Sequence, residues 1–156
     1  ATIAHQPGDV CLPGGMVEEG ETPREAALRE LQEELLLNKD QICYLGDMDK
    51  LYTGSRLIMY SFAAEVTEYH NTFSPAEVDE VFHVPLEFFL HTEPKCYITR
   101  ARVEPGEDFP YDLICGGREY NWRSRKEDVC FYQYEGHVIW GLTAKVIRAF
   151  AEVVRS

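Results

Sequence analysis

The sequence lacks an apolar run close to the roughly 20 residues that a helix needs to span a bilayer. Its start shows no basic segment followed by an apolar one, so no secretory signal is visible. Basic residues are few, with 15 Lys and Arg against 27 Asp and Glu and a net charge of −12. Because bare nucleic acid is bound through Lys and Arg, this balance argues against a nucleic-acid partner. We therefore predict a cytoplasmic protein that binds neither membranes nor nucleic acid.

Cysteines are also few and scattered. Five are present, and none forms a C-x-x-C pair (Cys11, Cys43, Cys96, Cys115 and Cys130). An odd, scattered set argues against a disulfide framework and against a zinc site. We expect reduced, buried thiols.

The length of 156 residues and a hydrophobic content of 45% predict a single domain over 1–156. Hydrophobic periodicity and turn residues predict both strands and helices. Residues 8–15 are predicted to form a short strand that runs into a Pro-Gly-Gly turn. The other predicted strands cover 42–45, 57–66, 78–84 and 129–134, and the predicted helices cover 22–37, 85–90 and 139–154. Residues 92–126 contain several Pro and Gly residues and are predicted to form a long, irregular functional loop.

The helix predicted from Thr22 to Leu37 has the strongest local signals. Thr22 is a candidate N-cap, Pro23 suits the first helical position, and Glu25 completes a capping box. At 100° per residue, an apolar stripe and an acidic cluster fall on different faces. The stripe is Leu28, Leu31 and Leu35, and the cluster is Glu30, Glu33 and Glu34.

The acidic cluster works against the stability of the helix. Like charges one turn apart cost about 0.2–0.5 kcal/mol per pair, and Arg29 can pair with Glu25 and Glu33 but not with every acid of the cluster. Hard divalent cations such as Mg²⁺ and Mn²⁺ take oxygen ligands, so the cluster is a candidate metal site. A solvated acidic helix face is the alternative for an isolated helix.

The full spacing around the cluster favours the metal site. The chain reads Gly15-x5-Glu21-x7-Arg29-Glu30-Leu31-x-Glu33-Glu34-x-Leu36-Leu37. This stretch resembles the Nudix box, G-x5-E-x7-R-E-U-x-E-E-x-G-U, in which U is a bulky aliphatic residue, and eight of the nine defined positions match. By average residue usage, chance gives such a match on the order of once in 10⁸ starting positions. The exception is Leu36 in place of glycine, and we expect Asn38 to take the left-handed cap position.

The resemblance implies an α/β/α sandwich, in which helices flank a mixed β-sheet and the box forms a loop–helix–loop. It also implies a Nudix diphosphatase, a hydrolase of acid anhydrides in phosphorus-containing compounds. The metal ligands that it implies, for Mg²⁺ or Mn²⁺, are Glu30, Glu33, Glu34 and the carbonyl of Gly15.

The resemblance assigns further roles in catalysis. Arg29 would orient the glutamates by salt bridges, and Glu21 would fix the loop against the helix. A metal-activated water would attack one phosphorus, and a carboxylate must accept its proton. Glu30 and Glu77 are the two candidates for this base, and plain surface exposure is the alternative for Glu77.

The sequences on either side of the box indicate which class of diphosphate substrate is expected. Gly8-x3-Leu12-Pro13-Gly14-Gly15 resembles the end of LLTxR[SA]x3Rx3Gx3FPGG, a pattern of Nudix enzymes that split coenzyme A, and residues 77–86 and 139–144 also resemble that subgroup. A coenzyme A substrate, giving 4′-phosphopantetheine and 3′,5′-ADP, is therefore implied, with Gly8, Pro13 and Gly14 as substrate-binding residues. Candidate partners for its 3′-phosphate are Arg24, Lys50, Arg56 and Lys95, and the sequence does not select among them.

The same pattern shows two departures. Ala4 stands where its second arginine is expected, and its LLTxR portion would precede Ala1. Because a missing first strand would leave a sheet edge open, we expect that an N-terminal strand is absent from this sequence. We keep two alternatives: a Nudix hydrolase of ADP-ribose or another nucleoside diphosphate derivative, and a non-catalytic Nudix-fold module. The resemblance also allows a homodimer, but the sequence indicates no interface.

Overall fold

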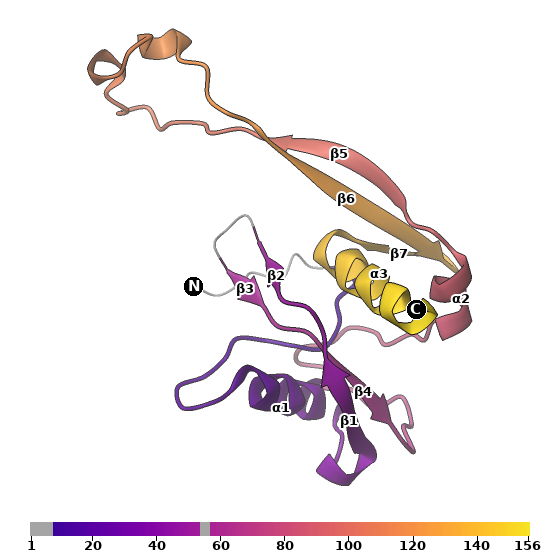
Figure 1. Cartoon of the computed structure of the whole chain (residues 1–156). Coiled ribbons are helices and arrows are strands. Elements are labelled where there is room, and N and C mark those ends of the chain that lie inside the picture. Colours follow the sequence, from indigo (N-terminus) through magenta and orange to yellow (C-terminus); the bar gives the residue numbers. More distant parts are fainter. Residues whose placement is uncertain (1–7, 54–56) are drawn as a thin grey trace.

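The computed structural model describes residues 8–53 and 57–156, which form both helices and antiparallel strands (Figure 1). Ala4 and Arg56, which entered the predictions above, lie outside these residues. None of the described helices is long and apolar enough to cross a membrane. The elements are α1 (Pro23–Leu35), η1 (Lys39–Gln41), β1 (Ile42–Asp47), β2 (Leu51–Tyr52), β3 (Ile58–Met59), β4 (Phe62–Val66), α2 (Leu86–His91), β5 (Lys95–Ala101), η2 (Tyr111–Leu113), η3 (Gly117–Glu119), β6 (Arg125–Tyr134), β7 (His137–Trp140) and α3 (Gly141–Arg155).

The strands form three separate sheets within the described residues. β1 pairs with β4, β2 pairs with β3, and β6 lies between β5 and β7. Every one of these pairs is antiparallel. The predicted α/β class is therefore confirmed, with its described strands in small antiparallel sheets.

The main core lies between α2, α3 and the sheet β5–β6–β7. Ala144 and Ala151 are completely buried, and their spacing of two helical turns places both on the face of α3 that meets the sheet. Small side chains there let the helix approach the strands closely. Around them pack buried residues from α2, β6 and β7: Phe89, Cys130, Tyr132 and Ile139.

Several predicted elements differ from the structure. Residues 8–15 and 78–84 form no strand, and the predicted strand 57–66 divides into β3 and β4. In 78–84, Phe82 and Val84 pack against the core from an irregular segment, so their apolar character reflects burial without strand pairing. The last helix begins at Gly141, because the residues before it form β7.

The predicted irregular loop 92–126 is wrong where strands form, whereas most of residues 102–124 are irregular as predicted. Its first part is β5, and its last two residues open β6, which pairs with β5 from Lys95↔Phe131 to Ala101↔Arg125. Between the strands, Phe109, Tyr111, Tyr120 and Trp122 pack edge to face with ring centres 4.9–5.6 Å apart. We call residues 95–126 the arm; Figure 1 shows it reaching away from the other elements.

The arm also corrects the expectation of reduced, buried thiols. Cys96 and Cys130 are directly opposite each other in β5 and β6 and form a disulfide across 34 residues of sequence. The remaining thiols of Cys11, Cys43 and Cys115 are free and exposed. The sequence could not reveal this pair, because only the register of the two strands brings the cysteines together.

Candidate active site

The helix that carries the acidic cluster begins with the predicted capping box. The Thr22 hydroxyl accepts a hydrogen bond from the Glu25 N–H at 3.3 Å, and the Glu25 carboxylate accepts one from the Thr22 N–H at 2.8 Å. These bonds satisfy N–H groups that a helix start leaves without partners. The Thr22 hydroxyl also donates to the Glu25 carboxylate at 2.6 Å, and this bond first, then the one from the Thr22 N–H, lowers the pKa of Glu25.

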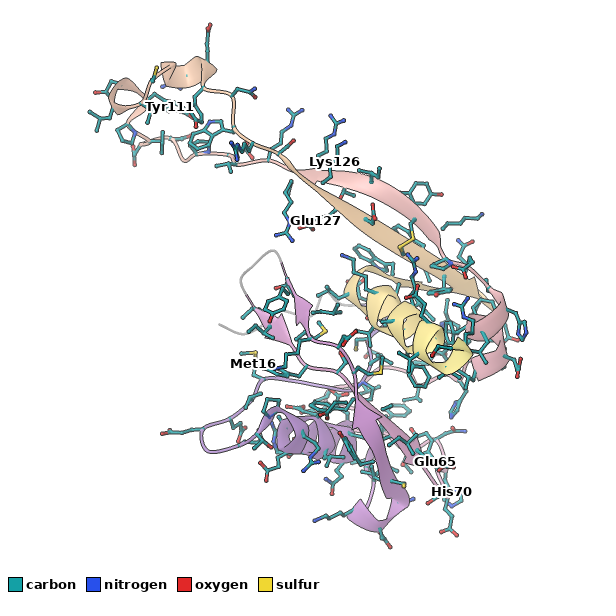
Figure 2. The ribbon with its side chains drawn as sticks, viewed as in Figure 1. Met16, Glu65, His70, Tyr111, Lys126 and Glu127 are labelled. Carbon is teal, nitrogen blue, oxygen red and sulfur yellow. A yellow bond between two sulfur atoms is a disulfide. The ribbon has the colours of Figure 1, made fainter. Side chains whose placement is uncertain are left out.

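Arg29 ties the helix to the loop before it. Its Nε donates to Glu21 at 3.0 Å, and one terminal nitrogen donates to Glu30 at 2.9 Å and to Glu33 at 3.1 Å. The other terminal nitrogen reaches Glu21 at 3.2 Å and the Met16 carbonyl at 3.3 Å. Figure 2 labels Met16 in this loop. One guanidinium therefore holds three carboxylates and one backbone carbonyl of the loop.

The pairing of Arg29 differs from the prediction in one partner. Arg29 contacts Glu21 instead of Glu25, because the capping box already uses the Glu25 carboxylate. Its hydrogen bond lowers the pKa of Glu21, with help from the N–H of Glu18. In return, Glu21 first and then Glu30 raise the pKa of Arg29. Each partner therefore favours the charged form of the other.

Gly15 and Glu30 lie against each other. A Cβ built on Gly15 would overlap the carboxyl group of Glu30, so no other residue fits here without a shift. The Glu30 side chain is mostly covered, with 18% of its surface exposed. The structure thus brings the backbone of the loop next to the first glutamate of the cluster, the pair that the resemblance implied.

The end of α1 is anchored by the segment that leads to Glu77. The Ser74 N–H donates to the Glu34 carbonyl at 2.8 Å, and the Thr72 hydroxyl donates to the Leu35 carbonyl at 2.7 Å. Glu77 follows in a turn, with its N–H donating to the Ser74 carbonyl at 3.1 Å. Its side chain is exposed and makes no contact with Glu30 within the described chain. The structure brings the segment of Glu77 to the helix end but not the carboxylate to the cluster.

Leu36 itself ends the helix in the left-handed conformation. Its φ is 53° and its ψ is 46°, whereas Asn38 is extended with a φ of −83°. The expectation that Asn38 would take this position is therefore wrong. The backbone needs a positive φ where the box has glycine, and Leu36 adopts it at a cost of about 1–2 kcal/mol.

The predicted substrate-binding residues Gly8, Pro13 and Gly14 lie in the segment before the helix. Two residues at the start of α3 anchor this segment: the Trp140 indole donates to Asp9 at 3.1 Å, and the Thr143 hydroxyl donates to the Val10 carbonyl at 3.0 Å. Sequence reasoning did not find these anchors, although both residues belong to the stretch 139–144 that resembles the coenzyme A subgroup.

The basic residues considered for a 3′-phosphate are not brought together. Arg24 lies over the ring of Tyr44 at 5.1 Å, and Lys50 lies over the ring of Tyr60 at 5.1 Å. Lys95 is the first residue of β5 and of the arm. No contact joins these three side chains in the described ranges, so the structure does not select among them.

The donors of the acidic cluster fit a hard divalent cation by their chemistry. Glu30 and Glu33 each give one oxygen to Arg29 and keep the other without a hydrogen bond in the described residues. The backbone of Gly15 lies against the Glu30 carboxyl group. Within residues 8–53 and 57–156, however, no three acidic, His or Cys side chains converge on one point. The chemistry of these donors suits the ion, but their side chains do not form a complete set of ligands around one point in the described residues.

Comparison with known proteins places these residues in a family. The model of the NUDIX domain matches residues 2–109, which include the loop, α1 and the end of α1. The chain belongs to the Nudix family. The predictions of a Nudix fold and of a Nudix hydrolase are thereby confirmed at the level of the family.

Individual relatives narrow the comparison. An uncharacterized Nudix hydrolase NudL of Photorhabdus laumondii is 28% identical over 157 residues, which cover 99% of this chain and 73% of the relative. The peroxisomal coenzyme A diphosphatase NUDT7 of Mus musculus is 35% identical over 116 residues, or 69% of this chain and 45% of the relative. The peroxisomal coenzyme A diphosphatase ndx-8 of Caenorhabditis elegans is 33% identical over 93 residues, or 56% of this chain and 39% of the relative. The chain thus spans less than half the length of these two diphosphatases.

Proposed function

We propose that this Nudix protein hydrolyses the diphosphate linkage of coenzyme A or its derivatives and releases 4′-phosphopantetheine and 3′,5′-ADP. The observation that carries the proposal is the Arg29 network, which holds Glu21, Glu30 and Glu33 beside Gly15. Two relatives that are named as coenzyme A diphosphatases support the choice of substrate.

Each box residue has a distinct task in this proposal. Glu30, Glu33, Glu34 and the Gly15 carbonyl would bind Mg²⁺ or Mn²⁺. When bound, such ions make water a stronger nucleophile and offset charge on phosphoryl oxygens. Arg29 keeps two of these carboxylates oriented, and Glu21 holds Arg29 from the loop side. The glycines before the helix leave space for a phosphate to approach the backbone.

The proton acceptor is proposed to be Glu30 or Glu77. Glu30 is close to Gly15 and mostly covered, which favours a role at the reacting group. Glu77 is exposed but belongs to the segment that caps α1, and substrate binding would have to bring its carboxylate to the cluster. Glu30→Gln and Glu77→Gln separate the two, because loss of the base removes the acidic limb of the pH profile of kcat, in which the rate rises as that carboxylate loses its proton.

The substrate is tested with a panel of diphosphates. The purified chain is incubated with Mg²⁺ or Mn²⁺ and with coenzyme A, ADP-ribose, a dinucleoside polyphosphate or a nucleoside triphosphate. We expect the highest kcat/KM for coenzyme A, with 3′,5′-ADP as product by mass spectrometry. Turnover of ADP-ribose with no turnover of coenzyme A would reject the substrate and keep the chemistry. Inertness toward the whole panel would instead favour a non-catalytic module.

A further inference from the structure

Residues 8–15 lead into the box, and we call them the leading segment. They contain the three proposed substrate-binding residues and end at Gly15, beside Glu30. Within the described chain they form neither helix nor strand, so no ladder of backbone hydrogen bonds fixes their path. Their position therefore depends on individual contacts with other elements.

Two of these contacts come from the junction between β7 and α3. The Thr143 hydroxyl donates to the Val10 carbonyl at 3.0 Å in a partly buried position, and the Trp140 indole N–H donates to Asp9 at 3.1 Å. The Val10 side chain also packs against the main core. One apolar contact and two directed hydrogen bonds thus meet at two consecutive residues of the leading segment.

The junction gives both donors a fixed orientation. Gly141 has a φ of 63°, a conformation that residues with a side chain rarely adopt, and it lets the chain turn from strand to helix. The Trp140 ring lies parallel to the ring of Phe131, with 5.8 Å between centres and 4° between planes. Thr143 precedes Ala144, which is completely buried. Packing on both sides of the turn therefore holds Trp140 and Thr143 in place.

The leading segment also lies against the acidic cluster. Gly15 is so close to Glu30 that a Cβ would overlap the carboxyl group. The pKa of the Cys11 thiol is raised, first because surrounding protein atoms reduce its hydration and then because the charges of Glu34 and Asp9 act on it. The segment therefore connects the β7–α3 junction to two of the glutamates that the proposed function assigns to a metal ion.

We propose that Thr143 and Trp140 are positioning residues for the metal site: they hold the leading segment where the Gly15 carbonyl and Glu30 can bind one ion. This inference rests on the metal role in the proposed function. Divalent cations bind oxygen atoms at short, narrowly defined distances, so a shift of the segment would remove a ligand. A single neutral hydrogen bond contributes little to net stability, so its loss can alter the site while the chain stays folded.

Thr143→Val tests the inference, because it keeps the shape of the side chain and removes the hydroxyl. The dissociation constant for Mn²⁺ is measured without substrate, from the electron paramagnetic resonance signal of the free ion. We expect Thr143→Val to raise it about tenfold, the lower end of the usual effect when a group that orients a metal ligand is lost. Thr143→Ser keeps the hydroxyl and should retain most of the affinity. Trp140→Phe keeps a ring on Phe131 without the N–H and should have a smaller effect, because its bond to Asp9 is exposed.

Thr99→Val is the matched control. Thr99 also donates its hydroxyl to a backbone carbonyl, that of Glu127 at 3.1 Å, but it lies in the arm. It should leave the dissociation constant for Mn²⁺ unchanged. Turnover of coenzyme A adds a second measurement, the Mg²⁺ concentration that gives half-maximal rate. Thr143→Val should raise this concentration, whereas unfolding of part of the protein would lower only the apparent kcat.

Three results would overturn the inference: an unchanged Mn²⁺ affinity in Thr143→Val, or an equal loss of affinity in Thr143→Ser or in Thr99→Val. A chain that binds Mn²⁺ but does not hydrolyse coenzyme A would reject the proposed substrate, while the comparison of Mn²⁺ dissociation constants would still decide the role of Thr143. If the unmodified chain bound no Mn²⁺, the inference and the metal role of the cluster would both be wrong.

Discussion

The helix α1 and the arm both place like charges next to each other, but they differ in whether the chain supplies residues of opposite charge. In and around α1, Arg29 pairs with three of the clustered acids, Glu21, Glu30 and Glu33. In the arm, Arg100 and Lys126 face each other without an acidic partner in the described chain. In α1 the acids have a basic partner and still leave carboxylate oxygens for an ion. In the arm the two basic side chains are exposed to solvent.

The largest effect is expected when one acid of the cluster in α1 is replaced. Glu34→Gln keeps the size of the side chain but removes its charge. We expect kcat/KM toward the best substrate to fall at least about a thousandfold, or about 4 kcal/mol, because metal binding and charge compensation are lost together. The melting temperature should stay the same or rise, since a like charge leaves the helix face.

Glu65→Gln is the matched control for this variant. Glu65 is an exposed residue of β4, opposite Cys43 in the strand pair, and is labelled in Figure 2. It should retain full turnover. If Glu34→Gln were as active as Glu65→Gln, Glu34 would have no role as a metal ligand.

The second prediction concerns what holds the arm together. Cys96 and Cys130 close a loop of 34 residues, and a cross-link of that span restricts the unfolded chain by about 3–4 kcal/mol. Reduction with dithiothreitol should lower the free energy of unfolding by about that amount, measured by urea denaturation. Cys96→Ser should show the lower stability with or without the reductant.

Cys115→Ser is the control, because Cys115 is a free thiol in the same arm. It should respond to the reductant as the unmodified protein does. A reductant effect that disappears in Cys115→Ser would show that the arm uses a different cysteine pair. Turnover should change little on reduction, because the bond lies far along the sequence from the box.

The same contrast explains what the sequence could predict. The capping box of Thr22 and Glu25, and the pairing of Arg29 with Glu33, depend on residues three and four positions apart, so helix geometry was enough. The disulfide and the strand pair of the arm join residues more than twenty positions apart. Their register depends on the whole fold, and the Pro and Gly residues of the tip concealed the strands on either side. The family resemblance implied that Glu21 fixes the loop against the helix, but its pairing with Arg29 was not predicted, because the two residues are eight positions apart.

A smaller effect is expected at the one box position that departs from the pattern. Leu36 has a φ of 53° and a side chain that is 56% exposed. Leu36→Gly should therefore relieve backbone strain and lose little packing. After the added entropy of the unfolded chain, we expect a net gain of about 0.5–1 kcal/mol. Leu36→Ala shortens the side chain but keeps its Cβ, so it should give no such gain in thermal unfolding.

The smallest expected effect concerns Glu21, which pairs with Arg29 from the loop before α1. Because Arg29 lowers the pKa of Glu21 below its unfolded value of about 4.3, the charged pair stabilises the fold above that pH. This contribution is lost as the pH falls through the folded pKa. Glu21→Gln should lower the melting temperature near neutral pH, and its difference from the unmodified protein should shrink below about pH 4. Glu19→Gln, in the same loop and without a side-chain partner in the described residues, should show no pH-dependent difference. A constant difference for Glu21→Gln would mean that Glu21 acts through packing, and that charge holds the loop less firmly than the contacts of Arg29 indicate.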